Sequence, residues 1–457
     1  MSFRHPFLLI AFLVASPSAR ADLVVESVDG DGVNLTVYQM TVNAAPEPVP
    51  ALRYHLTVRE SEMKHGNAAV YYLRGIPEGN DPERVFERLQ KDFPEDDVHG
   101  RQGPGWYSVE RPLASLDRKK LAEASRGFDR LYDSFVLPGS MRRDCDWGHG
   151  QIFEMSGPDI YAFLLPDVQT MRNFSRALML RARAAIARGD YDAAVETLRV
   201  NYQLGRHVGE SPFLVSSLVG IAITSMSNAI MVDLISAKDS PNLYWALSEL
   251  PDPLVNVRKA TQIEMDLGAR VVPVLQKAET AEHAPEEWSR LLAEDFKQLT
   301  KLLDSQQMWE ELIPYTTAGA ALVMYPPAKQ RLLESGMDAA RVEAMPVGQV
   351  LAIDAAREYR KRADGMEKWY YVPWREARVR QRAQFESDLA ESRLSGGFGV
   401  LLADLLLPAV ESARTAEIRV AWQIGGLRTV EALRMHAAAT GQFPERLQDV
   451  KIVPLPV

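Results

Sequence analysis

Residues 213–232 carry no charged side chain, and this run constrains the fold more than any other part of the sequence. A helix of that length either crosses a membrane or lies at the centre of a protein, where other helices cover it on every side. Small polar residues interrupt the run on several faces of the expected helix, at Ser216, Ser217, Thr224, Ser225, Ser227 and Asn228. We therefore expect a buried core helix rather than a membrane span, with further helices packed around it.

Prolines that follow a capping residue mark several expected helix starts. A Ser or Asp side chain accepts the first free N–H groups of a helix, and the proline after it presets the backbone angle of the first turn. The pairs are Asp81-Pro82, Ser211-Pro212, Ser240-Pro241 and Asp252-Pro253. The same reading predicts helices at residues 67–75, 82–92, 116–135, 167–188, 191–208, 212–236, 241–249, 253–279, 286–305, 317–335, 346–366, 374–391 and 398–439.

Residues 178–209 resemble one tetratricopeptide-like helical hairpin. Gly189 and Asp190 begin the turn, and small residues such as Ala182 and Ala185 would let the two helices approach closely. A stable stack usually needs at least about three such units, and the sequence shows one clearly. It therefore predicts an all-α fold, built as an irregular α-solenoid or as a multi-helix bundle of helical hairpins.

The N-terminus has the features of a secretory signal peptide over residues 1–21. Arg4 supplies a positive charge, residues 7–15 are apolar, and Ala19-Arg20-Ala21 has the small-x-small pattern of a cleavage site. The sequence thus predicts export, cleavage near Ala21, and a periplasmic or cell-envelope location.

Three further regions are predicted after the signal. Residues 22–50 alternate apolar and polar side chains around the Asp29-Gly30-Asp31-Gly32 turn, which predicts a short β-hairpin followed by a proline-rich linker. Residues 51–283 form a helical region that contains the hairpin at 178–209. Residues 284–457 form a C-terminal helical region.

Charge and cysteine content exclude some classes of protein. The formal net charge is −9, and an acidic surface repels phosphate backbones, so we expect no nucleic-acid partner. Cys145 is the only cysteine, which rules out an intramolecular disulfide framework. Packing must therefore stabilise the fold.

Motifs for nucleotide or zinc chemistry are missing from the sequence. There is no Gly-Lys pair for a phosphate-binding loop and no His-Glu-x-x-His helix for zinc. The turn at Gly30 lacks the spacing of a dinucleotide or calcium loop. The sequence predicts no catalytic residue, no cofactor-binding residue and no metal ligand.

The segment around Cys145 is the most chemically suggestive cluster. Cys145, Asp146 and His149 place a lone thiol near a carboxylate and an imidazole, a set that could serve as a nucleophile or a metal site. The alternative is a buried structural cysteine beside the packing residue Trp147. We keep Cys145, Asp146 and His149 as binding candidates.

Aromatic residues concentrate at a second candidate segment. Trp369, Tyr370, Tyr371 and Trp374 surround an expected helix break at Pro373. Flat rings there could bind a peptide, a sugar face or another helix, whereas the alternative is core packing at a corner between helices.

Several stretches resemble a family of exported bacterial helical proteins to which no activity is attached. They are residues 50–54 (PALRY), 66–72 (GNAAVYY), 145–147 (CDW), 164–166 (LLP), 241–247 (PNLYWAL), 345–350 (MPVGQV), 368–369 (KW), 427–434 and 444–456. The resemblance implies a helical fold and supplies no function.

Two functions stay open at this point. The first is an exported helical scaffold that binds protein or peptide partners in the cell envelope, which the helical body and the missing catalytic motifs favour. The second is a helical enzyme whose active residues come from distant helices and so leave no local motif, with Cys145 and His149 as the first suspects.

Overall fold

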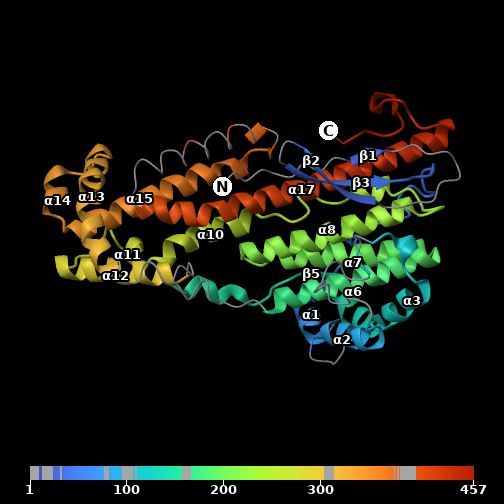
Figure 1. Cartoon of the computed structure of the whole chain (residues 1–457), viewed down its shortest axis with the longest axis horizontal. Coiled ribbons are helices and arrows are strands. Elements are labelled where there is room, and N and C mark those ends of the chain that lie inside the picture. Colours follow the sequence, from blue (N-terminus) through green and yellow to red (C-terminus); the bar gives the residue numbers. More distant parts are fainter. Residues whose placement is uncertain are drawn as a thin grey trace.

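The computed structural model of the chain describes residues 10–12, 24–30, 33–76, 82–94, 107–108, 111–156, 166–302, 313–374, 376–377, 380, 387 and 398–456. These residues form an elongated multi-helix body with short strands in its N-terminal part (Figure 1). The predicted all-α fold class is confirmed.

Two small sheets lie in the N-terminal part of the chain. In the first, β3 (Val33–Met40) lies between β1 (Ile10–Phe12) and β2 (Val24–Gly30). Strands β2 and β3 are antiparallel and form the expected hairpin. Strand β1 falls within the predicted signal peptide, most of which lies outside the described residues. The second sheet pairs β4 (Lys64–Asn67) with β5 (Arg142–Asp144) in parallel.

A layer of short helices follows β4 in the sequence. Its elements are α1 (Ala68–Gly75), α2 (Pro82–Asp92), the 3₁₀ turn η1 (Leu113–Ser115), α3 (Arg118–Arg126), α4 (Asp129–Leu131), the π-helical turn η2 (Tyr132–Val136), α5 (Leu137–Ser140) and the 3₁₀ helix η3 (His149–Glu154). The single helix predicted at residues 116–135 is wrong, because the chain breaks after α3 at Gly127. The break and the wider turn that follows bury Phe128 and Tyr132 in the core.

Three long helices form the centre of the molecule. They are α6 (Pro166–Arg188), α7 (Tyr191–Gly209) and α8 (Leu214–Ser236). Helices α6 and α7 form the hairpin expected at residues 178–209. Gly189 turns the chain with φ of 75°, and the Asp190 side chain accepts from the Ala193 N–H at the start of α7.

Helix α8 contains the uncharged run. A Cβ atom at Gly220 would lie 2.5 Å from the carbonyl oxygen of Gly205, so the backbones of α7 and α8 touch there. Within the part of the chain that the structure describes, α8 is the helix with the length and composition of a membrane span, and 72% of its apolar stretch is buried. The helix therefore lies in the protein core, as the small polar residues predicted.

The cap predicted at Ser211 for this helix is wrong. Helix α8 begins after Phe213, and its Leu214 N–H bonds to the carboxyl group of Glu264. Ser211 lies two residues before the N-cap position, and its hydroxyl is paired with His149 at 2.9 Å. Asp81, the predicted cap of α2, lies outside the described residues.

The caps predicted at Ser240 and Asp252 are also wrong. Helix α9 (Tyr244–Ser248) begins after Leu243, and the Asn242 side chain accepts from the Tyr244 N–H at 3.0 Å. Helix α10 (Arg258–Val271) begins after Val257. The Ser240 hydroxyl instead accepts from Arg434 at 2.8 Å.

The remaining helices form the other end of the molecule and the long helix that runs along it. They are α11 (Pro273–Gln276), α12 (Pro285–Leu302), α13 (Ile313–Glu334), α14 (Ala339–Ala344), α15 (Val347–Glu367), the 3₁₀ turn η5 (Lys368–Tyr371), α17 (Phe398–Thr440) and the 3₁₀ turn η6 (Leu447–Asp449). The predicted helix at 253–279 is divided between α10 and α11, α14 was not predicted, and most of the predicted helix at 374–391 lies outside the described residues. Helix α17 has 43 residues, which at about 1.5 Å per residue gives roughly 65 Å. It runs along the long axis and packs against α8 and α15 (Figure 1).

One hydrophobic core continues through both predicted helical regions. Buried apolar residues connect without a gap from Met40, beside the N-terminal strands, to Val430 in α17. Helix α17 thus completes the core around α8.

Candidate functional site

The segment that contains Cys145, Asp146 and His149 is fixed to the start of α1. The Asn67 side chain donates to the carbonyl oxygen of Asp146 at 2.6 Å and accepts from the Asp146 N–H at 2.9 Å. The Asp146 carboxylate accepts from the N–H of Gly148 at 2.9 Å. Asp146 is therefore occupied in shaping the turn that presents His149.

Cys145 lies inside the protein rather than in an open site. Its side chain is buried, and this burial, with a smaller effect from the Glu210 carboxylate, raises the pKa of the thiol well above its usual range. The structure therefore gives Cys145 no thiolate character at neutral pH, and no hydrogen bond described joins it to His149.

His149 instead connects two distant parts of the chain. Its Nδ1 lies 2.9 Å from Ser211 Oγ, and its Nε2 lies 3.0 Å from a carboxylate oxygen of Asp167 in the first turn of α6. The Phe213 ring packs edge-on against the imidazole, with 5.6 Å between the ring centres. Ser211 and Asp167 were not among the predicted site residues, because nothing in their local sequence marks them.

A second histidine, His207, lies in an apolar setting nearby. Tyr72 Oη is 2.8 Å from its Nδ1, and the Gln203 amide is 2.8 Å from its Nε2. The Trp147 indole donates to the His207 carbonyl oxygen at 2.9 Å. The imidazole is fully buried, so its two ring nitrogens depend on protein partners such as these for their polar contacts.

Acid is expected to destabilise the protein through His207. Burial, with a smaller effect from Arg206, lowers the pKa of His207 from 6.5 to about 3. The folded state therefore resists protonation that the unfolded chain accepts, and the stability present above pH 6.5 is lost as the pH falls toward 3. Between pH 6.5 and 4 the expected loss of unfolding free energy is roughly 3 kcal/mol.

Urea unfolding at stepped pH values measures this loss. His207→Gln keeps a polar side chain that does not titrate, so its stability should fall less steeply than that of the wild type. The exposed His283→Gln variant serves as the control and should follow the wild type. Parallel pH curves for wild type and His207→Gln would contradict the assignment.

The aromatic segment does not form one continuous face. Tyr370 is buried, donates to the Val410 carbonyl oxygen at 3.0 Å, and fixes η5 to α17. Tyr371 is 53% exposed and lies on the α10 side, where the Arg258 guanidinium is 4.0 Å from its ring centre. Trp369 and Trp374 are half-buried. The structure thus separates the rings that the sequence places together.

A third feature lies at the C-terminal end of α17. Gly441 ends the helix with φ of 83°, and the following residues 442–456, here called the C-terminal hook, fold back onto α9 and α17. Val450 and Val453 of the hook pack with Tyr244, Ala432 and Met435 in a small separate core.

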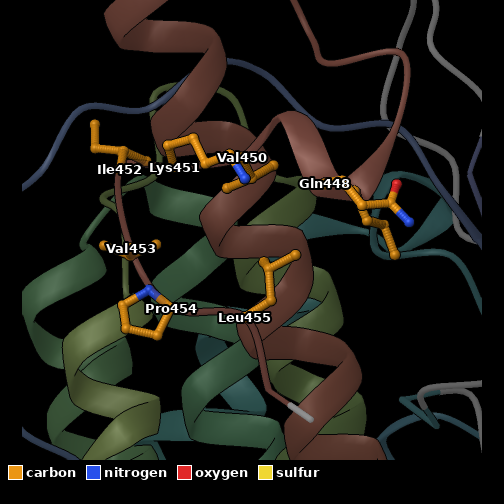
Figure 2. A pocket seen from close by; sticks show the side chains of 8 residues that line it. Gln448, Val450, Lys451, Ile452, Val453, Pro454 and Leu455 are labelled. Atoms are coloured by element: carbon orange, nitrogen blue, oxygen red, sulfur yellow. The ribbon is translucent and has the colours of Figure 1, made fainter.

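The hook lines a shallow hollow of about 620 Å³ that is widely open to solvent. Figure 2 shows the side chains that surround it. They are mainly apolar, namely Leu447, Val450, Ile452, Val453, Pro454 and Leu455, with the polar residues Gln448 and Lys451. Leu447 and Ile452 remain 49% and 45% exposed. Sequence reasoning missed this hollow, because the hook is irregular and its shape depends on contacts with α9.

The described elements define an elongated all-α protein with a buried polar network at one site and an apolar hollow at another. Among the described residues, no group of three or more His, Cys, Asp or Glu side chains could hold a metal ion. Comparisons with protein-family models, curated proteins and solved structures give no match.

Proposed function

We propose that this chain is an exported helical scaffold that binds an extended peptide segment of a protein partner at the C-terminal hook. The observation that carries the proposal is the apolar hollow at residues 447–455, where Leu447 and Ile452 stay exposed while Val450 and Val453 are buried and fix the segment. Exposed apolar side chains around a concave surface are typical of interaction sites.

The backbone of the hook supports recognition of an extended peptide. The amide and carbonyl groups of Lys451, Ile452 and Val453 take part in no backbone hydrogen bond among the described residues. An extended peptide could pair with these groups and place alternate side chains in the hollow. Lys451 would favour a partner segment that carries a carboxylate.

The hook is held firmly enough to act as a preformed site. The Tyr244 hydroxyl donates to the Pro454 carbonyl oxygen, and the buried core beneath the hook includes residues from α9 and α17. A preformed site reduces the entropy lost on binding. The resemblance of the α6–α7 hairpin to a tetratricopeptide unit is consistent with a binding role, but the proposal does not depend on it.

Site-specific photo-crosslinking tests the proposal. A photoreactive amino acid replaces Gln448 in the tagged full chain, and crosslinked products from the cell envelope are identified by mass spectrometry. We expect one polypeptide to crosslink reproducibly, with the contact mapped to a short segment containing apolar residues.

Matched variants decide the result. Leu447→Glu with Ile452→Glu should reduce that crosslink at least tenfold, because two charges then line the hollow. Leu322→Glu with Val323→Glu changes two apolar residues of α13 that are 79% and 75% exposed at the other end of the molecule (Figure 1), and it should leave the crosslink unchanged. An equal yield from all forms, or no crosslinked polypeptide, would reject the proposal.

Export is a separate part of the proposal and rests on residues 1–21. The mature N-terminus, measured by mass spectrometry on protein from the producing cell, should begin near Asp22. A full-length chain in the cytoplasmic fraction would contradict export without bearing on the hook.

A further inference from the structure

We propose that Ser211, His149 and Asp167 form an acyl-transfer site that cleaves carboxylic esters with a small apolar acyl group. The inference is independent of peptide binding at the hook. The Ser211 Oγ to His149 Nδ1 distance is 2.9 Å and the His149 Nε2 to Asp167 distance is 3.0 Å. A serine, an imidazole and a carboxylate linked in this order are the parts that acyl transfer by serine requires.

The hydrogen-bond chemistry fixes the direction of the proton path. An ionised carboxylate only accepts hydrogen bonds. His149 Nε2 therefore carries a hydrogen and donates a hydrogen bond to Asp167. In the neutral ring Nδ1 is then the acceptor, and the Ser211 hydroxyl donates to it. The two ring nitrogens are exchanged relative to the serine proteases, but the serine still faces the basic nitrogen.

The carboxylate is suited to its role as the positioning residue. Burial alone would raise the pKa of Asp167, but the hydrogen bond from His149 and those from backbone N–H groups at the start of α6 lower it on balance. Asp167 therefore stays ionised, orients the imidazole and stabilises the imidazolium that forms during the reaction.

Ser211 lies at a shallow depth. It is 3% exposed, yet its neighbour Glu210 is exposed and Val215, one turn into α8, is 46% exposed. Because Ser211 itself is 3% exposed, acyl transfer requires the start of α8 to move so that the hydroxyl meets the substrate. This position also lies just before the N-terminus of α8, a helix of 23 residues.

The start of α8 can stabilise negative charge. The Val215 N–H has no hydrogen-bond partner among the described residues, and the positive end of the helix dipole favours an oxyanion there. The Phe213 ring packs against His149 and Val215 is 46% exposed, so the apolar side chains at this helix start suit a small apolar acyl group.

The reaction balances with water as the second reactant. Ser211 Oγ forms a bond to the ester carbonyl carbon while its proton passes to His149 Nδ1. The C–O bond to the alcohol then breaks, and the leaving oxygen takes that proton. Water, deprotonated by His149, attacks the acyl-serine and releases the carboxylic acid and free Ser211.

A fluorophosphonate probe on the full chain tests the site. Ser211 Oγ would form a P–O bond, fluoride would leave, and His149 would take the proton. We expect peptide mapping of the wild-type protein to place the phosphonate on Ser211. His149→Gln should slow this labelling by roughly 100-fold or more.

Further variants separate catalysis from structure. Ser217→Ala, which removes another buried hydroxyl, should label at the wild-type rate. Asp167→Asn should slow labelling and Asp167→Glu should restore part of it, with unfolding temperatures as the check on folding. An unlabelled Ser211 in folded wild type at saturating probe would overturn the proposal. Labelling that His149→Gln does not slow would overturn it as well.

Discussion

Asp233→Ala is expected to lower the unfolding free energy by about 3–5 kcal/mol. Asp233 in α8 and Arg183 in α6 form an ion pair in the core, with 2.8 Å between Arg183 Nε and the carboxylate and side chains that are 2% and 0% exposed. The variant would leave the guanidinium buried without its counter-ion. A buried unpaired charge is among the most costly defects a fold can carry.

Arg183 cannot escape to solvent in that variant. Its other nitrogens donate to the carbonyl oxygens of Tyr107, Ser108 and Arg111, each at 2.6 Å. Burial raises the pKa of Asp233 to about 6 and lowers that of Arg183. Removing the two charges from water is therefore unfavourable even in the wild-type protein. Removing one partner keeps that cost and loses the attraction.

Urea unfolding of the single variant and two comparison proteins measures the effect. Arg290 and Glu287 form an exposed pair, with 59% and 40% of their side chains accessible, so Glu287→Ala should cost far less than Asp233→Ala. Arg183→Met with Asp233→Leu removes both charges and should recover much of the loss. A cost for Asp233→Ala no greater than that of Glu287→Ala would contradict the prediction.

Arg434→Met is expected to cost a similar amount and to release the contacts that hold residues 43–45 on α17. Arg434 is 1% exposed. Its guanidinium donates to the carbonyl oxygens of Asn43, Pro241 and Ser240 at 2.9, 3.3 and 2.9 Å. It also pairs with the buried Glu431 at 2.9 Å. Methionine fills a comparable volume but satisfies none of these acceptors, so a loss of about 3–5 kcal/mol is expected.

Hydrogen exchange and urea unfolding together test this prediction. The Ala45 N–H donates to the Arg434 carbonyl oxygen at 3.1 Å, and its exchange should accelerate in the variant because the neighbouring loop loses its support. Arg419→Met changes a half-buried arginine of the same helix for which the structure describes no hydrogen bond or ion pair, and it should cost less than 1 kcal/mol. Equal losses of unfolding free energy in the two variants would show that Arg434 does not hold residues 43–45 on α17.

The long helices were predictable because local patterns specify them. The helices expected at residues 167–188, 191–208 and 398–439 lie within a residue or two of α6, α7 and α17. The uncharged run was predicted as a core helix, and α8 is buried. Each of these elements carries its own composition and turn signals, so neighbouring sequence was sufficient.

Helix starts were less predictable, since a capping side chain has other partners available. Ser211 and Ser240 precede prolines, as caps do, yet they bond to His149 and Arg434. These partners are 62 and 194 residues away in the sequence. A local rule cannot weigh such contacts, and Glu264 and Asn242 take over the capping roles.

For the candidate sites, the sequence predicted some of the residues, and only the structure showed which partners they have. His149 was predicted as a candidate from its place near Cys145, but its partners are Ser211 and Asp167, while Cys145 is a buried thiol. The aromatic residues 369–374 were predicted as one group, and the helix break turns Tyr370 inward and Tyr371 outward. Residues 444–456 resemble the same family of exported helical proteins, but nothing in them predicted the hollow.

By itself, the sequence determined the helical class, the buried central helix and most long elements, because these follow from periodicity, charge and turn chemistry within short windows. Only the tertiary structure decided which polar side chains meet. Hydrogen bonds and ion pairs such as His149 with Asp167, or Arg183 with Asp233, form between segments that the packing of α6, α7 and α8 brings together. Their energies depend on burial and on distances of about 3 Å, which no local pattern encodes.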